Sequence, residues 1–244
     1  MQEKSIVQAI NQYKQQLRQS FNLKAVFFDM DGVLFDSMPL HAEAWLKTFS
    51  AYGLHLSAEE PYMNEGSTAQ YTVKRMFQKY LNKEASDDLA EAIKQKKHDY
   101  MALLPQPEII QAMPLLLQNI AGSGIDCWVV TGSGQAILID RLEKEFHPAL
   151  KREKMITAND VKKGKPDPEP YLMAMKKSGY GLHQSLVVEN APLGVRSAKA
   201  AGLFTIAINT GPINESHLWD AGADLVFASS NELEHHWTLI HQSF

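Results

Sequence analysis

The sequence predicts an α/β fold built on a doubly wound parallel sheet, with a helical segment inserted near its N-terminal end. Two observations support this prediction. Short apolar runs with strand character alternate with helical patterns in the second half of the chain, and nearly a hundred residues separate the first apolar run from the second. Strands that are apolar along their whole length are typical of a parallel sheet covered by helices on both faces.

Five apolar runs are the expected strands: Ala25–Asp29, Cys127–Thr131, Ser185–Asn190, Phe204–Asn209 and Asp224–Ala228. Helical patterns fill the gaps after the second run, at Gln135–Phe146, Asp167–Lys177 and Pro192–Ala201. A short amphipathic helix is also expected over residues 3–20, because Ile6, Ile10 and Leu17 lie on one side of it.

The stretch between the first two runs is strongly helical. In residues 73–81, apolar side chains recur at positions i, i+3, i+4, i+7 and i+8, as on one face of a helix. Pro105 and Pro107 mark the end of the pattern. We therefore expect a core domain formed by residues 1–37 and 108–244, with residues 38–107 inserted as a helical domain.

Composition excludes several classes of protein. The chain has 244 residues, 45% hydrophobic and 21% charged, with a formal net charge of −4, so no basic excess is present to bind nucleic acid. Its N-terminal segment is polar and no run is long enough to cross a membrane, so we expect a cytoplasmic protein without membrane contact. The single cysteine, Cys127, excludes an intramolecular disulfide, and no obligate protein partner is evident.

Three of the expected strands end in short polar side chains. Asp29 and Asp31 follow the first strand, Thr131 is followed by Gly132 and Ser133, and Glu189 precedes Asn190. Ligands bind beyond the carboxyl ends of strands in such sheets, so these side chains predict an acidic pocket with hydrogen-bond donors. The alternative is that Asp29-Met30-Asp31-Gly32 is only a turn, in which Asp and Gly are common.

Two carboxylates separated by one residue can hold a hard cation, or one can attack while the other exchanges protons. The segment DMDGVLFDS resembles the first motif of the haloacid dehalogenase superfamily, in the β-phosphoglucomutase branch with a small helical cap. VVTGS, KGKPDPEPY and VVENAPLGVRSAKAAG resemble the second, third and fourth motifs. Together these motifs extend from Lys24 to about Ala228, and the resemblance implies a Rossmann-like core.

The resemblance also implies roles for individual residues. Asp29 would be the nucleophile that becomes an aspartyl phosphate, and Asp31 would protonate the leaving group and then deprotonate water. Lys165 would tie Asp29 to the phosphoryl group, and Thr131 would contact a phosphoryl oxygen. The expected Mg²⁺ ligands are Asp29, Asp31 through its backbone carbonyl, Glu189 and Asn190. Gly32, Gly132 and Ser133 are expected to contact the substrate.

Two positions suggest substrate contacts from the helical cap. His41 lies where β-phosphoglucomutases have a histidine at the entrance to the cap, and it could exchange protons near Asp31. The equally weighted alternative is a partly buried histidine of a helix. Lys96, further along the cap, also favours a mutase.

Asn190 departs from the family pattern, which has a carboxylate at this position. A second departure is Glu65-Gly66-Ser67-Thr68-Ala69, because the mutases carry lysine and arginine where this chain has Glu65 and Ala69. If Glu65 reaches the metal when the cap closes, it replaces the carboxylate lost at 190, as in an inorganic pyrophosphatase subgroup of the superfamily. The alternative is that Glu65 is a solvated loop acid and Asn190 a neutral substitution.

The sequence thus predicts a Mg²⁺-dependent phosphohydrolase acting on a small phosphorylated substrate, with inorganic pyrophosphate the first choice. The alternative is a β-phosphoglucomutase that interconverts β-glucose 1-phosphate and glucose 6-phosphate. A third possibility is a non-enzymatic protein that has kept the fold. All four catalytic positions hold reactive residue types, which argues against it.

Overall fold

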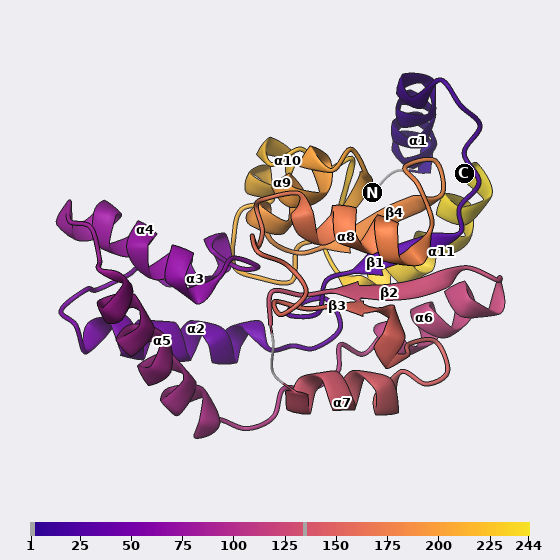
Figure 1. The fold of residues 1–244 in the computed structure, drawn as a ribbon. Coiled ribbons are helices and arrows are strands. Elements are labelled where there is room, and N and C mark those ends of the chain that lie inside the picture. Colours follow the sequence, from indigo (N-terminus) through magenta and orange to yellow (C-terminus); the bar gives the residue numbers. More distant parts are fainter. Residues whose placement is uncertain (1–2, 134–135) are drawn as a thin grey trace.

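The computed structural model describes residues 3–133 and 136–244. In these residues one parallel sheet of six strands has the order β3-β2-β1-β4-β5-β6 (Figure 1). The strands are β1 (Ala25–Phe28), β2 (Asp126–Val130), β3 (Met155–Ile156), β4 (Ser185–Glu189), β5 (Phe204–Ile208) and β6 (Leu225–Phe227). The predicted fold class is confirmed, and the five predicted strands are present.

Strand β3 was not expected, because two residues are too few to give a periodic signal. The expected helices are α1 (Glu3–Leu17), α7 (Ala136–Glu145), α8 (Glu169–Ser178) and α9 (Pro192–Ala200), and the predicted start of the second at Gln135 lies outside the described residues. Sequence patterns missed α6 (Met113–Gly122), α10 (Ser216–Asp220), α11 (Ser230–Ser243) and a short 3₁₀ turn, η1 (Arg152–Lys154).

Alternate residues of β1 point to opposite faces of the sheet, and both faces are covered. Val26 and Phe28 pack into the apolar cluster that contains residues of α1, α6, α7 and α11. Ala25 and Phe27 pack into a second cluster with residues of α8 and α9. All four side chains are fully buried, which explains why this strand is apolar along its whole length.

The chain leaves the sheet after β1 and forms four consecutive helices, α2 (Met38–Ser50), α3 (Glu60–Met63), α4 (Ala69–Leu81) and α5 (Asp87–Ala102). Figure 1 shows them gathered to one side of the sheet. Helices α2, α4 and α5 share an apolar cluster of their own that includes Phe49, Val73 and Ile93. Tyr62 and Met63 of α3 pack instead against an apolar cluster of the core. We call this segment the cap; its limits at 38 and 107 remain a prediction. Among the described residues no helix is long and apolar enough to cross a membrane.

Candidate active site

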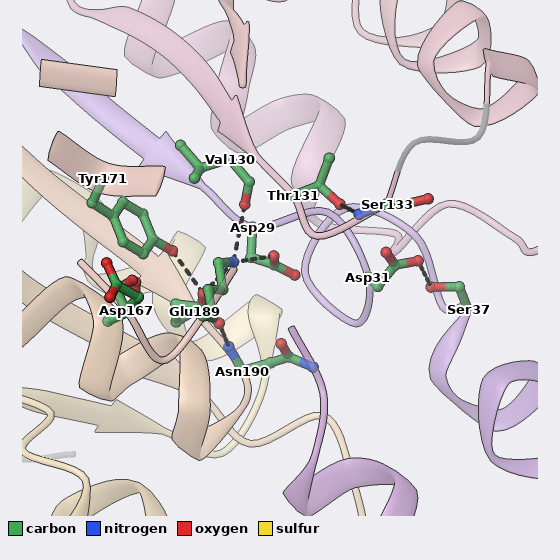
Figure 2. Close-up of polar contacts among 12 residues, drawn as sticks. Asp29, Asp31, Ser37, Val130, Thr131, Ser133, Asp167, Tyr171, Glu189 and Asn190 are labelled. Carbon is green, nitrogen blue, oxygen red and sulfur yellow. Dashed lines mark hydrogen bonds and ion pairs between the residues drawn. The ribbon is translucent and has the colours of Figure 1, made fainter. Parts of the chain in front are cut away.

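The carboxyl ends of β1, β2 and β4 meet at one edge of the sheet. Phe28 pairs with Val129 of β2 and with Val188 of β4, so the residues that follow these strands leave the sheet side by side. The backbone N–H of Asp29 donates to the carbonyl of Val188, and that of Thr131 donates to the carbonyl of Ile156. Figure 2 shows the resulting group of polar side chains.

Asp29 and Lys165 form a buried ion pair at the centre of this group. The Lys165 Nζ donates to Asp29 Oδ1 at 2.5 Å, to Glu189 Oε1 at 2.6 Å and to the Val130 carbonyl at 3.0 Å. Both side chains are at most 2% exposed. Because an ammonium group has three N–H donors, this arrangement uses all of them and leaves Asp29 Oδ2 without a partner.

Burial raises the pKa of the Asp29 carboxyl to about 8, against the lowering effect of Lys165. The negative charges of Glu189 and Asp31 act in the same direction as burial. A cation bound at Asp29 Oδ2 would favour the carboxylate and oppose this shift. Asp29 and Lys165 are therefore suited to a site in which a bound metal ion offsets the remaining negative charge.

The Glu189 carboxylate accepts hydrogen bonds from three donors. Its Oε1 accepts hydrogen bonds from Lys165 and from the Tyr171 hydroxyl, at 2.6 Å each, and its Oε2 accepts from the Asn190 backbone N–H at 3.1 Å. Glu189 is therefore a partner of Lys165, and its expected role as a Mg²⁺ ligand stays a prediction. Tyr171 was missed, because nothing in the sequence marks its hydroxyl as facing Glu189.

Asp31 lies at the cap side of the pocket and is held by Ser37, another residue that the sequence did not single out. The Ser37 hydroxyl donates to Asp31 Oδ1 at 2.5 Å. His41 Nε2 lies 3.5 Å from the same oxygen, a long contact that leaves this nitrogen without a hydrogen bond. The opposite ring nitrogen, Nδ1, lies 3.2 Å from Lys97 Nζ.

Burial and the Lys97 charge lower the pKa of His41 to about 4, although Asp31 opposes the shift. The imidazole is therefore neutral near pH 7. Lys97 can donate only to an unprotonated Nδ1, so the ring proton is assigned to Nε2, on the side of Asp31. His41 thus lines the cavity between a cap lysine and Asp31, and its proton exchange with Asp31 stays a prediction.

Lys96 does not occupy the place expected for it. Its Nζ lies 5.5 Å from the centre of the Tyr100 ring, away from the cavity. The next residue, Lys97, is only 6% exposed and lines the cavity with its charge over the Trp45 ring. Neighbouring residues of a helix point in directions about 100° apart. Lys97 therefore faces the cavity, and Lys96, the residue that the sequence suggested, does not.

Thr131, Gly132 and Ser133 end β2 at the wall of the pocket. The Thr131 hydroxyl accepts a hydrogen bond from the Ser133 backbone N–H at 2.9 Å, and Gly132 and Ser133 line the cavity. Gly134, the next residue, lies outside the described residues. The phosphoryl contacts expected of Thr131, Gly132 and Ser133 stay a prediction.

Gly32 is bound through both of its backbone polar groups, and the substrate contact expected of it stays a prediction. Its N–H donates to the Phe35 carbonyl at 2.7 Å, and its carbonyl accepts from the Thr210 hydroxyl at 2.7 Å. Its φ of +80° is in the region that favours glycine, and an added Cβ would lie 2.1 Å from Asn190 Nδ2. Gly32 therefore makes room for Asn190.

The cap loop that carries Glu65 is seated on the core. The carbonyl oxygen of Gly66 lies 2.8 Å from the position of a Cβ added at Gly132. A Cβ added at Gly66 would in turn come almost as close to the Lys165 side chain. Glu65 lines the cavity. Burial and the negative charges of Asp31 and Asp29 raise the pKa of the Glu65 carboxyl well above its ordinary value. The loop thus brings a carboxylate into the field of the two core aspartates.

Asp29 Oδ2 and Asn190 Oδ1, at the ends of β1 and β4, are buried oxygens that lack a hydrogen-bond partner, and Asn64 Oδ1 of the cap is another. Unpaired buried oxygens are costly, and oxygen is the donor that Mg²⁺ prefers. Among the described residues no cluster of three His, Cys, Asp or Glu side chains forms a ready metal site. The carboxylate oxygen of Asp29 and the amide oxygen of Asn190 are nevertheless donors that fit a hard cation.

Cap and core together enclose a cavity of about 460 Å³. Its lining includes Asp31, His41, Glu65, Lys97, Gly132 and Ser133. The acidic residues of the lining are Asp31, Glu65 and Glu91 and its lysines are Lys94 and Lys97, so the cavity carries side chains of both charges. A carboxyl group such as that of Asp31 at the wall of a cavity is a candidate to exchange a proton with a bound ligand.

Residues 26–208, which contain Asp29, Asp31, Glu65, Thr131, Lys165, Glu189 and Asn190, match the family model of haloacid dehalogenase-like hydrolases. The chain belongs to this family. A solved structure described as "Putative beta-phosphoglucomutase from Bacteroides vulgatus" is 42% identical, covers 99% of both chains and has a TM-score of 0.94. This haloacid dehalogenase-like chain therefore shares both its core and its cap with that structure.

Two curated relatives of this chain are phosphatases. Hexitol phosphatase A of Escherichia coli is 32% identical over 76% of this chain and 83% of its own length. The phosphorylated carbohydrates phosphatase of Thermotoga maritima is 28% identical over 82% of this chain and 92% of its own length. With the site geometry, these similarities identify the chain as a phosphoryl-transfer enzyme.

Proposed function

We propose that this chain is a Mg²⁺-dependent phosphohydrolase that works through an aspartyl phosphate at Asp29, with inorganic pyrophosphate as its substrate. The observation that carries the choice of substrate is the position of Glu65, whose carboxylate lies in the field of Asp29 and Asp31 while Asn190 supplies only an amide. A cap acid at the metal would restore the carboxylate that position 190 lacks.

In the first step, a carboxylate oxygen of Asp29 attacks phosphorus and the bond from phosphorus to the leaving oxygen breaks. Asp31 gives its proton to that oxygen, which leaves as inorganic phosphate. In the second step, Asp31 takes a proton from water, whose oxygen attacks the phosphoryl group and releases Asp29 and a second phosphate. Lys165 binds Asp29 Oδ1 and holds the carboxylate in place.

Asp29, the Asp31 backbone carbonyl, Asn190 and Glu65 would hold Mg²⁺, which would neutralise the charge of the phosphoryl oxygens. The Thr131 loop contacts those oxygens from the side of β2. Lys97 places a positive charge in the same cavity, where the distal phosphate of pyrophosphate would bind. A small substrate with high charge matches this set of groups.

A second candidate is hydrolysis of phosphorylated sugars. Two relatives are phosphatases whose names specify hexitol and carbohydrate substrates. A cavity of about 460 Å³ also leaves space for an organic group beside the phosphate. The mutase alternative is supported by the 42% identical structure but opposed by Ala69, which offers no charge to a second phosphate.

Steady-state kinetics with pyrophosphate, a hexitol phosphate, hexose 6-phosphates and β-glucose 1-phosphate test the proposal. We expect the highest kcat/KM for pyrophosphate, and loss of turnover when EDTA removes Mg²⁺. A kcat/KM for any sugar phosphate about tenfold above that for pyrophosphate would favour the second candidate. Activity that persists in EDTA, and does not rise when Mg²⁺ is restored, would contradict the metal dependence.

A further inference from the structure

Glu60 is a buried carboxylate of the cap for which the proposed mechanism has no use. It begins α3 and is only 6% exposed. Its Oε1 forms an ion pair with Lys79 and accepts a longer hydrogen bond of 3.3 Å from the Tyr80 hydroxyl, both from α4. A buried charge held in this way fixes two helices of the cap relative to each other.

The other oxygen of Glu60 connects to the loop that carries Glu65. Asn64 Nδ2 donates to Glu60 Oε2 at 3.2 Å and to the Glu60 carbonyl at 2.7 Å. The Asn64 carbonyl in turn accepts from the Ser67 hydroxyl at 2.8 Å, and Ser67 Oγ lies 2.7 Å from Thr72 Oγ1 in α4. Both ends of residues 64–67 are thus tied to α4 through side chains.

Backbone hydrogen bonds contribute little to this loop. The N–H groups of Glu65 and Ser67 make contacts of 3.4 Å, at the long limit for such bonds. Gly66 has a φ of +80° and packs against Lys165 and Gly132 of the core. Without its side-chain ties, the loop would gain conformational freedom that must be lost again whenever Glu65 enters the site.

We propose that Glu60 is a positioning residue: together with Lys79 and Asn64 it holds residues 64–67 in the conformation that brings Glu65 and Gly66 onto the core. We call these three residues the loop brace. An effect of Glu60 on metal binding rests on the proposed function, since it requires Glu65 to act as a metal ligand. An effect of Glu60 on the conformation of residues 64–67 does not rest on it.

Two measurements on Glu60→Gln test the loop brace. Hydrogen exchange of a peptide covering residues 64–68 should become faster, because the loop opens more often. The Mg²⁺ concentration for half-maximal activity should rise about tenfold, a typical cost of losing a residue that orients a metal ligand. Activity is measured with pyrophosphate, or with p-nitrophenyl phosphate if pyrophosphate is not hydrolysed. Lys79→Met, at a side chain that is 54% exposed, provides a second variant that should fold normally.

A double-mutant cycle distinguishes positioning from general destabilisation. In a Glu65→Ala background, Glu60→Gln should leave the Mg²⁺ requirement unchanged, because the group that it positions is already absent. Glu43→Gln, in the exposed Glu43–Lys47 pair of α2, is the control within the cap. Asp224→Asn, in the partly buried pair with Lys199, is the control for lost stability outside it.

Unchanged exchange of residues 64–68 in both Glu60→Gln and Lys79→Met would overturn the inference. Additive effects of Glu60→Gln and Glu65→Ala on the Mg²⁺ requirement would overturn it as well. If Glu65→Ala alone leaves the Mg²⁺ requirement normal, the proposed function fails instead, and the exchange measurement then decides whether Glu60 holds the loop.

Discussion

Lys165 binds one oxygen of Asp29 and leaves the other without a partner: its Nζ lies 2.5 Å from Oδ1, and Oδ2 is buried and unpaired. The remaining lysine donors go to Glu189 and to the Val130 carbonyl. The ion pair therefore fixes the orientation of the Asp29 carboxylate. Glu189, fixed in turn by the Tyr171 hydroxyl, keeps the lysine in place.

The first prediction concerns this nucleophile. Asp29→Asn should reduce kcat by about 10⁶, the scale seen when a covalent nucleophile is removed from a catalytic unit. The fold should persist, because the change is nearly isosteric and Lys165 keeps its contact with Glu189. Pre-steady-state kinetics and circular dichroism measure the two effects. A rate near that of the wild type would contradict the covalent mechanism.

Asp31→Asn should lower kcat by about 10²–10⁴, the usual contribution of a proton-transferring side chain. The Ser37 hydroxyl can still donate to the amide oxygen, so the side chain should stay in place. Asp36→Asn, at an exposed acid in the same segment, is the matched control and should stay within about twofold of wild type. Equal rates for the two variants would show that Asp31 does not transfer protons.

A third prediction separates hydrolase from mutase. With β-glucose 1-phosphate and a bisphosphate primer, a mutase must hold the distal phosphate in the cap. Ala69 cannot pair with phosphate and Glu65 repels it, although Lys97 attracts it. We expect little or no glucose 6-phosphate in a coupled assay. Isomerisation faster than any hydrolysis would reverse this ranking of functions.

Glu65 and Asn190 should be coupled through the metal. Glu65→Ala should raise the Mg²⁺ requirement and lower activity by about tenfold or more, whereas Glu59→Ala, at an exposed acid before α3, should have little effect. Asn190→Asp should partly restore Glu65→Ala, because a carboxylate returns to the same cation. Magnesium titration of the four variants in the cycle measures the coupling. Independent effects would make Glu65 an ordinary loop acid.

Gly132 should be required for the cap loop to seat on the core. A Cβ at this position would lie 2.8 Å from the Gly66 carbonyl oxygen, so Gly132→Ala must push the loop outward. Displacement on the scale of 1 Å can reduce turnover by about 10². Gly122→Ala, where an added Cβ meets nothing within 4 Å, is the control. Unchanged kinetics in Gly132→Ala would show that turnover does not require this contact.

The sequence by itself determined the fold class and the residues at the strand ends. Strands buried on both faces must be apolar along their length, and parallel strands carry their functional residues at their carboxyl ends, so both features leave local signals. Asp29, Asp31 and Thr131 could be placed on this basis. Strand β3, with two residues, leaves no comparable signal.

Only the tertiary structure decided how these residues are paired. Lys165 reaches Asp29 across 136 positions of the chain, and the same lysine binds Glu189. Whether Lys96 or Lys97 faces the cavity depends on the rotation of α5 about its axis. The position of Glu65 depends on the contact between the cap and Gly132. Such choices arise from contacts between distant segments, because side-chain direction and burial exist only after the chain has packed.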